Sequence, residues 1–227
     1  MLRVALTGGV GSGKSAAAAM LRALGAQVSH SDEVGRALMQ PGQPVFAGIR
    51  EHFGPAVLQA NGELDRAALA SIAFAQGRVE ELNAIVHPAV IAAQAQWMER
   101  VRADDPSAVA IVESALIFET RHGDSVSGQA SAPWRSRFDR IVVITAPVEL
   151  RRRRYVERVL QSAGRDAAAA SADFDQRAAA QWTDKRKAAL ADTVIRNDGS
   201  LQDLQHHMAH LYQTLRQEAA DDATEAM

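Results

Sequence analysis

The feature of this sequence that most restricts its fold is a glycine-rich run near its start. The stretch from Gly8 to Ser15 spells Gly-Gly-Val-Gly-Ser-Gly-Lys-Ser and matches the pattern G-x-x-x-x-G-K-[ST]. It lies between an apolar run at 2–7, which predicts a buried strand, and a helical pattern of apolar residues over 14–24. A strand, a glycine loop and a helix in this order place backbone N–H groups around an anion, so the sequence predicts a nucleoside triphosphate site.

The residue types within this loop predict separate roles. Glycines permit positive φ and let the backbone approach a phosphate closely. We expect the ammonium group of Lys14 to reach the β- and γ-phosphates and the hydroxyl of Ser15 to ligate Mg²⁺. The loop residues predicted to bind the nucleotide are Gly8, Gly9, Gly11, Ser12, Gly13, Lys14, Ser15 and Ala16.

The rest of the chain alternates predicted strands with predicted helices, which favours an α/β architecture around a parallel sheet. Further strands are predicted at 26–28, 108–112, 140–145 and 193–195. Helical patterns at 44–53, 65–75 and 79–101 form an excursion between strands, and Gly and Pro residues separate them.

The second half contains less regular segments. Residues 120–137 are rich in Gly, Ser and polar residues and predict a mobile surface loop. A basic helix is expected at 147–160, followed by a segment of low complexity at 161–172 and an Ala-rich helix to about 191. An amphipathic helix at 201–218 precedes a polar tail at 221–225 that we expect to fray.

Composition excludes several classes of protein. The 227 residues include 25 Lys and Arg against 27 Asp and Glu, a net charge of −2, which argues against a basic nucleic-acid coat protein. The absence of Cys excludes a disulfide framework and a thiolate zinc site. No apolar stretch approaches the roughly 20 residues that a membrane span needs. We therefore expect a cytoplasmic protein that binds neither membranes nor nucleic acids.

Other motifs in the sequence indicate which class of nucleotide-binding enzyme carries this glycine loop. A GTPase should carry an Asn-Lys-x-Asp guanine motif, which the sequence lacks. A large ATPase usually has an aliphatic strand ending in Asp, whereas Ile111-Val112 is followed by Glu113. A kinase needs an acceptor pocket, a carboxylate that orients and deprotonates the acceptor hydroxyl, and arginines that bind the transferred phosphate.

Asp32 is the candidate carboxylate. It follows the second predicted strand and so is expected at the carboxyl edge of the sheet, where ligands bind in α/β proteins. Its alternative role is to cap the N-terminus of a helix over 33–39, and the two roles are compatible.

Two other features each have two interpretations. Arg151, Arg154 and Arg158 share one helix face and form either a solvated or nucleic-acid-binding surface or a cluster that clamps transferring phosphate. Pro88 disfavours a helical conformation at His87, so this pair predicts either a kink in the 79–101 helix or a turn that shapes the acceptor pocket.

Taken in order, these motifs resemble the dephospho-CoA kinase family. The segments that carry the resemblance are Thr7–Ser15, Val28–Asp32, His87-Pro88, Ala115–Glu119, Ala146–Arg158, Lys187 and Ala191–Gly199. The glycine loop alone is generic, but the ordered set is specific to this family and covers about residues 2–201.

The resemblance implies the fold in more detail: a P-loop kinase-type parallel five-stranded sheet flanked by helices, in a single domain over 1–227. The core would comprise about 1–40, 103–150 and 190–227, with a helical acceptor-binding insertion at about 41–102 and a helical lid at about 151–189. The implied reaction is the ATP- and Mg²⁺-dependent phosphorylation of the ribose 3′-hydroxyl of dephospho-CoA, which gives coenzyme A and ADP.

The resemblance also implies residue roles. Asp32 would be the base, and Arg154 and Arg158 would contact ATP from the lid. The remaining implied positions are Asn197 and Gly199 near the adenine, Arg140 near the phosphates, and His87 and Glu119 at the acceptor.

The sequence departs from the family pattern at four positions, none of which removes a required chemical group. His30 stands where the family usually has Asp, Ala115 replaces Pro, Ala16 replaces Thr and Arg151 replaces Gln. The alternatives that stay open are a nucleoside or nucleotide kinase of the same architecture and a nucleic-acid-stimulated ATPase.

Overall fold

The structure, a computed structural model, describes residues 1–120, 134–163 and 166–225. The chain divides into two compact units. The first consists of Met1–Ser29, Arg100–Glu119 and Trp134–Met227, and the second contains His30–Glu99. Among the described residues, every helix is too short or too polar to cross a lipid bilayer.

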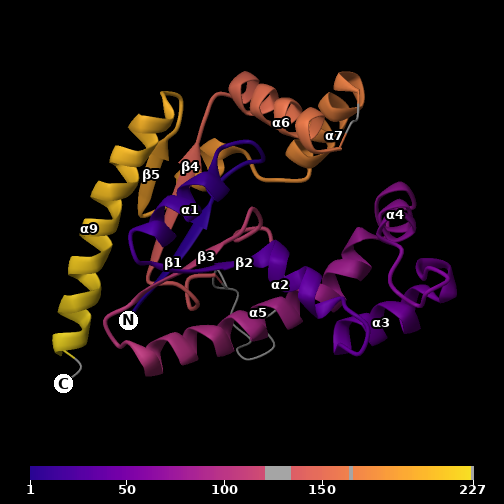
Figure 1. Cartoon of the computed structure of the whole chain (residues 1–227), viewed down its shortest axis with the longest axis horizontal. Helices are drawn as coiled ribbons and strands as arrows, with labels where there is room; N and C mark the ends of the chain where they lie inside the picture. Colours follow the sequence, from indigo (N-terminus) through magenta and orange to yellow (C-terminus); the bar gives the residue numbers. More distant parts are fainter. Residues whose placement is uncertain (121–133, 164–165, 226–227) are drawn as a thin grey trace. The chain divides into compact units, whose positions relative to one another are not determined.

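A five-stranded parallel sheet forms the centre of the first unit (Figure 1). Its order is β2 (Gln27–His30), β3 (Val109–Glu113), β1 (Leu2–Thr7), β4 (Arg140–Thr145) and β5 (Thr193–Arg196). In the register, Val4 of β1 lies opposite Ile111 of β3 and Arg140 of β4. The strands predicted from the sequence are confirmed, and the bounds of β1 and β4 are as predicted.

One face of this sheet is covered by α1 (Lys14–Ala23) and α9 (Leu201–Glu225) (Figure 1). Alternate strand residues such as Leu6 and Ile144 pack there against Leu21 of α1 and Met208 of α9. The intervening strand residues, among them Ala5, Val112 and Val143, are also buried. Burial on both faces is the usual state of a parallel sheet, and it explains why these strands are apolar without alternation.

The second unit is helical. It contains α2 (Ser31–Leu38), α3 (Pro44–Phe53), the 3₁₀ turn η1 (Pro55–Val57), α4 (Arg66–Ala70), the π-helical turn η2 (Ser71–Ala75) and most of α5 (Val79–Asp104). The core of this unit is formed by side chains of α3, α4 and α5, including Ile49, Leu69 and Val86. The helices predicted at 44–53 and 79–101 are confirmed.

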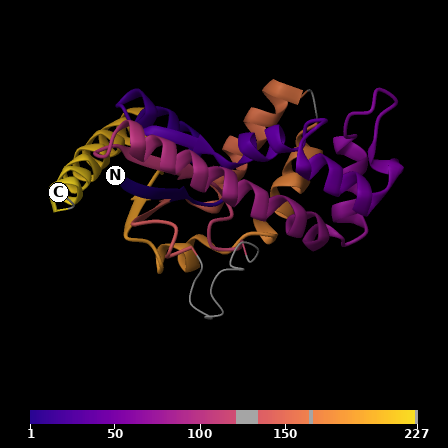
Figure 2. The same cartoon turned by 90° about the horizontal axis from the view of Figure 1, so that it is seen from below.

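The helix predicted at 65–75 starts where expected but changes its geometry. The carboxylate of Asp65 caps α4 by accepting hydrogen bonds from the amides of Ala67 and Ala68, both at 2.9 Å. From Ser71 the backbone continues as the π-helical η2. By contrast, α5 passes through Pro88 as one continuous helix (Figure 2), so the helix is not interrupted at His87-Pro88.

The prediction that one Ala-rich helix extends to about residue 191 is wrong. The structure has α6 (Val148–Ala163), α7 (Ala167–Ala179) and α8 (Asp184–Ala188). The chain leaves α7 at Ala179, and Thr183 caps a new helix by accepting a hydrogen bond from the amide of Arg186 at 3.3 Å. Most of the low-complexity segment is helical, because Asp166 caps α7 in the same way.

One further expectation needs correction, and another is only partly open to comparison. The tail at 221–225 is not frayed but belongs to α9, and the nearby Ala219 is fully buried in the core. Residues 121–133 of the predicted mobile loop lie outside the described residues, and at its end Arg135 and Ser136 are exposed whereas Trp134 is buried. Trp134 is 6% exposed and packs edge-on against Phe118 at 5.0 Å between ring centroids.

Candidate active site

The glycine loop adopts a conformation that requires glycine. Gly11 and Gly13 have φ of +75° and +99°. A Cβ on Gly11 would lie 2.3 Å from the carbonyl oxygen of Arg151, and one on Gly13 would lie 2.2 Å from Nδ2 of Asn197. The loop is therefore packed closely between the start of α6 and the end of β5.

The N-terminus of α1 opens directly from this loop. Its N-cap is Gly13, which offers no side-chain cap, and the first turn carries no acidic residue. The first helical hydrogen bond runs from the amide of Ala17 to the carbonyl of Gly13 at 3.0 Å. The amides of Lys14, Ser15 and Ala16 precede it and have no acceptor within the helix. Together with the helix dipole, they form a site for an anion such as a phosphate.

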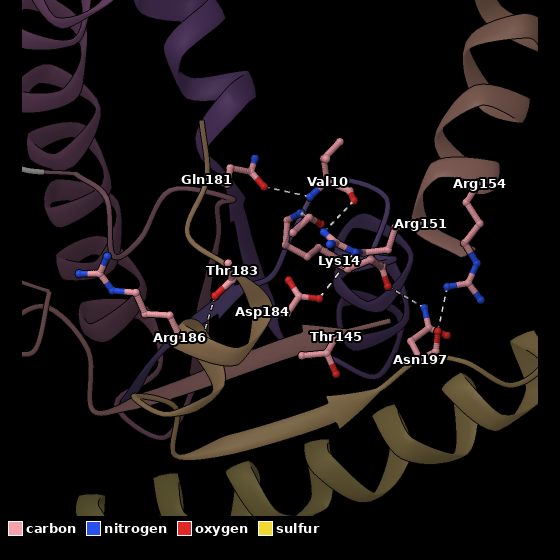
Figure 3. A network of polar contacts seen from close by, with 12 residues as sticks. Val10, Lys14, Thr145, Arg151, Arg154, Gln181, Thr183, Asp184, Arg186 and Asn197 are labelled. Carbon is pink, nitrogen blue, oxygen red and sulfur yellow. Dashed lines mark hydrogen bonds and ion pairs between the residues drawn. The ribbon is translucent and has the colours of Figure 1, made fainter. Parts of the chain in front are cut away.

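The ammonium group of Lys14 lies beside the same anion site. Its side chain is buried, with a residue exposure of 8%, and its Nζ donates a hydrogen bond to the carbonyl of Gly9 at 3.1 Å. The ammonium group thus lies over the loop rather than in bulk solvent (Figure 3).

Ser15 supplies the chemistry that a magnesium ion needs at this point. It is exposed and is the second residue of α1, next to the amides that face the anion. Mg²⁺ prefers hard oxygen ligands and is usually held by one or two protein oxygens together with substrate phosphates and waters. The described residues contain no group of three or more acidic or histidine ligands for a metal. The donor set at Ser15 therefore fits Mg²⁺ held jointly with a nucleotide.

Asn197, predicted near the adenine, holds the loop in shape. It is 6% exposed, and its Nδ2 donates to the carbonyl of Ser12 at 2.8 Å. The backbone carbonyl of Asn197 accepts a hydrogen bond from Nη1 of Arg154 at 2.9 Å (Figure 3). A cavity of about 310 Å³ beside it is lined by Arg196, Asn197, Gly199 and His206, among others. The predicted adenine contacts of Asn197 and Gly199 stay predictions.

Three further residues surround the loop: Arg151, which belongs to the arginine cluster predicted from the sequence, and Gln181 and Asp184, which sequence reasoning did not place in the site. Nη1 of Arg151 donates to the carbonyl of Val10 at 3.5 Å, and its Nε lies 3.6 Å from a carboxylate oxygen of Asp184. The side-chain oxygen of Gln181 accepts a hydrogen bond from the amide of Val10 at 3.0 Å (Figure 3). The arginine run pointed toward Arg151, but Gln181 and Asp184 have no local signal in the sequence.

The other arginines of α6 have different partners. Arg152 forms an ion pair with Asp175 of α7 at 2.7 Å, and Arg158 is exposed with its guanidinium 5.2 Å from the ring of Tyr155. The Tyr155 hydroxyl donates to Asp173 of α7, and burial and this hydrogen bond both raise its pKa. The run is thus not a uniform solvated face. The predicted ATP contact of Arg158 stays a prediction.

Glu119, predicted at the acceptor, takes part in a buried ion pair. Nζ of Lys187 lies 2.8 Å from Oε1 of Glu119 and donates to the carbonyl of Ala115 at 2.6 Å. The Lys187 side chain is fully buried, and the amide of Trp182 donates to the same Glu119 oxygen at 2.8 Å. These contacts fix the segment that carries Gln181 and Asp184. A contact of Glu119 with the acceptor stays a prediction.

Arg140 is not at the phosphate site. It begins β4 opposite Val4, whereas the glycine loop follows Thr7, which lies opposite Val143. Its Nε forms an ion pair with Glu218 of α9 at 2.8 Å. Because the amino ends of parallel strands lie at the edge of the sheet opposite their carboxyl ends, the expectation that Arg140 contacts the phosphates is wrong.

The candidate base belongs to the second unit. Helix α2 begins at Ser31 with His30 as its N-cap, so Asp32 is its second residue and does not cap it as the alternative interpretation expected. Asp32 is exposed, and α2 is tied to α5 by a hydrogen bond from Gln94 to the Ser31 hydroxyl at 2.8 Å. His87 is half-buried on α5. The juxtaposition of Asp32 with the glycine loop stays a prediction, as does the role of His87.

Comparison with known proteins gives a consistent result. Residues 2–203 match the family model described as dephospho-CoA kinase. A dephospho-CoA kinase of Moorella thermoacetica is 33% identical over 98% of this chain and 96% of its own length. A dephospho-CoA kinase of Frankia casuarinae is 38% identical over 95% of this chain and 84% of its own length.

Solved structures agree at the level of the fold. A crystal structure from Thermus thermophilus matches with a TM-score of 0.69 and 27% identity, covering 94% of this chain and 97% of that one. The structure of a dephospho-CoA kinase from Campylobacter jejuni matches with a TM-score of 0.55 and 20% identity over 94% of this chain and 96% of its own.

Proposed function

The chain belongs to the dephospho-CoA kinase family, and from that premise we propose which of its residues perform the reaction. The enzyme transfers the γ-phosphoryl group of ATP to the ribose 3′-hydroxyl of dephospho-CoA, the last step of coenzyme A biosynthesis. One P–O bond to ADP breaks, one P–O bond to the 3′-oxygen forms, and the hydroxyl proton leaves to a base.

The glycine loop and the start of α1 bind the triphosphate. The amides of Gly11 to Ala16 and the ammonium group of Lys14 donate to its oxygens, while Gly8 and Gly9 shape the turn. The hydroxyl of Ser15 would hold Mg²⁺, which would supply positive charge to stabilise the transferring phosphoryl group. Asn197 holds the loop in shape through the Ser12 carbonyl, and Arg154, anchored to the backbone carbonyl of Asn197, would donate its remaining N–H groups to the nucleotide.

Asp32 orients the acceptor hydroxyl in line with the γ-phosphate and accepts its proton. Arg158 approaches the phosphates from α6, and α6 and α7 act as a lid that excludes water from the reacting groups. Glu119 and His87 contribute to the acceptor side. Excluding water matters because a water molecule would otherwise accept the phosphoryl group.

One observation supports this function above the others: the loop can be built only with glycine at positions 11 and 13. At both positions φ is positive and a Cβ would collide with neighbouring groups. Such a loop, opening an uncapped helix in a chain that matches one kinase family over residues 2–203, is what phosphate binding requires.

The test is ADP release measured by a coupled assay with ATP, Mg²⁺ and a panel of acceptors: dephospho-CoA, adenosine, AMP, CMP and water. We expect dephospho-CoA to give the highest kcat/KM by at least an order of magnitude. A preference for AMP or CMP would instead indicate a nucleotide kinase, and stimulation of ATP hydrolysis by added DNA or RNA would indicate a nucleic-acid-dependent ATPase.

A further inference from the structure

Three charged side chains of the second unit find no partner among the described residues. Asp32 and Arg36 lie one turn apart on α2, and Arg66 is the first residue of α4. All three are exposed, and the described part of the chain offers none of them a side-chain hydrogen bond or an ion pair. The i, i+4 spacing of Asp32 and Arg36 would allow them to pair with each other, yet they do not.

These three side chains line one pocket of about 240 Å³. Its other walls include the apolar residues Met39, Val86 and Val90. The pocket thus combines an apolar wall with two guanidinium groups and one carboxylate, the arrangement expected for a ligand that has both a flat apolar part and an anionic part.

A glycine in the floor of this pocket carries independent information. Gly35 is a buried residue in the middle of α2, where glycine makes a helix less stable than alanine would. Its φ is not positive, and a Cβ there would meet only Cγ2 of Val90, at 3.7 Å, an ordinary contact distance. Neither backbone conformation nor packing therefore requires glycine. The space that a methyl group would occupy belongs to the pocket.

We propose that Arg36 and Arg66 bind the diphosphate of dephospho-CoA in this pocket, and so select an acceptor that carries a diphosphate over a bare nucleoside. The inference rests on the proposed function. Arginine presents a planar set of donors that matches phosphate oxygens, and two arginines match the two phosphates of a diphosphate. The apolar wall over Gly35 receives the adjoining nucleoside.

The spacing on α2 agrees with the chemistry of the acceptor. The side chains of residues i and i+4 of a helix lie about 5–6 Å apart. The ribose of dephospho-CoA carries the reacting 3′-hydroxyl on one carbon and the diphosphate on its 5′-oxygen. Asp32 would bind the 3′-hydroxyl while Arg36 binds the diphosphate at the other end of the same sugar. Arg66 is the first residue of α4. The carboxylate of Asp65 caps this helix by accepting hydrogen bonds from its amides, which fixes the position of the turn that carries Arg66.

Arg66 and Met39 also line a second cavity of about 300 Å³, whose wall includes Gln40 and Gln59. Dephospho-CoA continues beyond its diphosphate into a chain with two amide groups. A cavity with side-chain amides, sharing Arg66 with the first pocket, is suited to receive that chain.

The test compares dephospho-CoA with adenosine as acceptors in the coupled assay at saturating ATP. We expect Arg36→Ala and Arg66→Ala each to lower the ratio of kcat/KM for dephospho-CoA to that for adenosine by roughly 10- to 100-fold, the loss expected for a charge-assisted hydrogen bond. The effect should fall on the KM for dephospho-CoA, with little change in kcat or in the KM for ATP.

Arg50→Ala is the matched control, because Arg50 is an exposed arginine of the same unit that lines neither cavity. A ratio that is unchanged in the Arg36 and Arg66 variants, or lowered as much by Arg50→Ala, overturns the proposal. An equal loss of kcat with both acceptors also overturns it, because it would place these arginines on the transferred phosphate.

Gly35→Ala separates ligand binding from folding. We expect this variant to unfold at the same or a higher temperature than the wild type, while its KM for dephospho-CoA rises several-fold. An unchanged KM would show that the pocket floor does not contact the acceptor. If the wild-type chain itself fails to phosphorylate dephospho-CoA, the proposed function is wrong rather than this inference alone.

Discussion

The two units of the molecule differ in whether the charged side chains singled out above have partners within the protein. In the first unit, Lys14, Arg151 and Lys187 are each held by protein oxygens at distances between 2.6 and 3.6 Å. In the second unit, Asp32, Arg36 and Arg66 line a pocket without a partner among the described residues. The phosphate loop is thus held in shape by its surroundings, whereas the proposed acceptor pocket keeps its charges available to a ligand.

This difference has a physical reason. A loop that donates backbone N–H groups must keep a defined, glycine-dependent shape, and contacts to Asn197 and Gln181 fix that shape. An acceptor pocket must discriminate between ligands, and a charge that is already paired adds little to that discrimination. Substitutions around the loop in the first unit should therefore damage catalysis or stability, and substitutions of Arg36 and Arg66 in the second should change selectivity.

The largest effect is expected for Lys14→Met. Without the ammonium group, the transferring phosphoryl group loses a stabilising positive charge, so kcat should fall by about 10³- to 10⁵-fold. Initial rates of ADP release measure this, with Lys185→Met, an exposed lysine of α8, as the control. Turnover within 10-fold of the wild type would remove the phosphate-site assignment.

Lys187→Met should cost stability rather than chemistry. The substitution leaves Glu119 as a buried carboxylate without its cation, which typically costs about 3–5 kcal/mol. Urea unfolding followed by tryptophan fluorescence gives the free energy of unfolding. The double variant Lys187→Met/Glu119→Gln should regain part of the loss because the unpaired charge is gone. A single-variant cost below about 1 kcal/mol would show that the pair contributes little to the fold.

Gln181→Ala is expected to have an intermediate effect. The amide of Val10 loses its acceptor, at a cost of about 0.5–1.5 kcal/mol, so the KM for ATP should rise roughly 2- to 10-fold. Gln205→Ala, an exposed residue of α9, is the control. If the KM for ATP stayed the same while the free energy of unfolding fell, Gln181 would support the fold without shaping the loop.

Arg140→Ala should have the smallest effect. Its ion pair with Glu218 is partly exposed, with 44% and 31% of the two side chains accessible, and such pairs contribute about 0.2–1 kcal/mol. We expect turnover and the KM for ATP to match those of the wild type while the free energy of unfolding falls slightly. A loss of turnover by an order of magnitude or more would return Arg140 to the active site.

Features could be predicted from the sequence where the residues that determine them are close together in the chain. The strands, α1 and α3 depend on apolar runs, glycines and prolines within a few residues, and their predicted bounds are close to those observed. The glycine loop could be recognised because its chemistry is contained in eight consecutive residues. The break between α7 and α8 is hidden by the surrounding alanines, although Thr183 could have been recognised as a helix cap.

Contacts between distant segments could not be predicted in this way. Gln181 meets Val10 across 171 residues, and Lys187 meets Ala115 across 72. Arg140 shows the opposite error, because its role was transferred from the resemblance although a residue that begins a parallel strand lies at the edge away from the loop. Arg66 lies in a helix that was predicted, but only the fold brings it to the same pocket as Asp32.

Asp32 is the proposed base that binds the acceptor hydroxyl and accepts its proton. The most direct test is the steady-state kinetics of Asp32→Asn with ATP and dephospho-CoA, beside Glu33→Gln, the neighbouring exposed carboxylate of the same helix turn. We predict that Asp32→Asn lowers kcat by about 10²- to 10⁴-fold, the usual contribution of a general base, and leaves the KM for ATP within about 2-fold. Turnover near that of the wild type, or an equal loss in Glu33→Gln, would contradict the account.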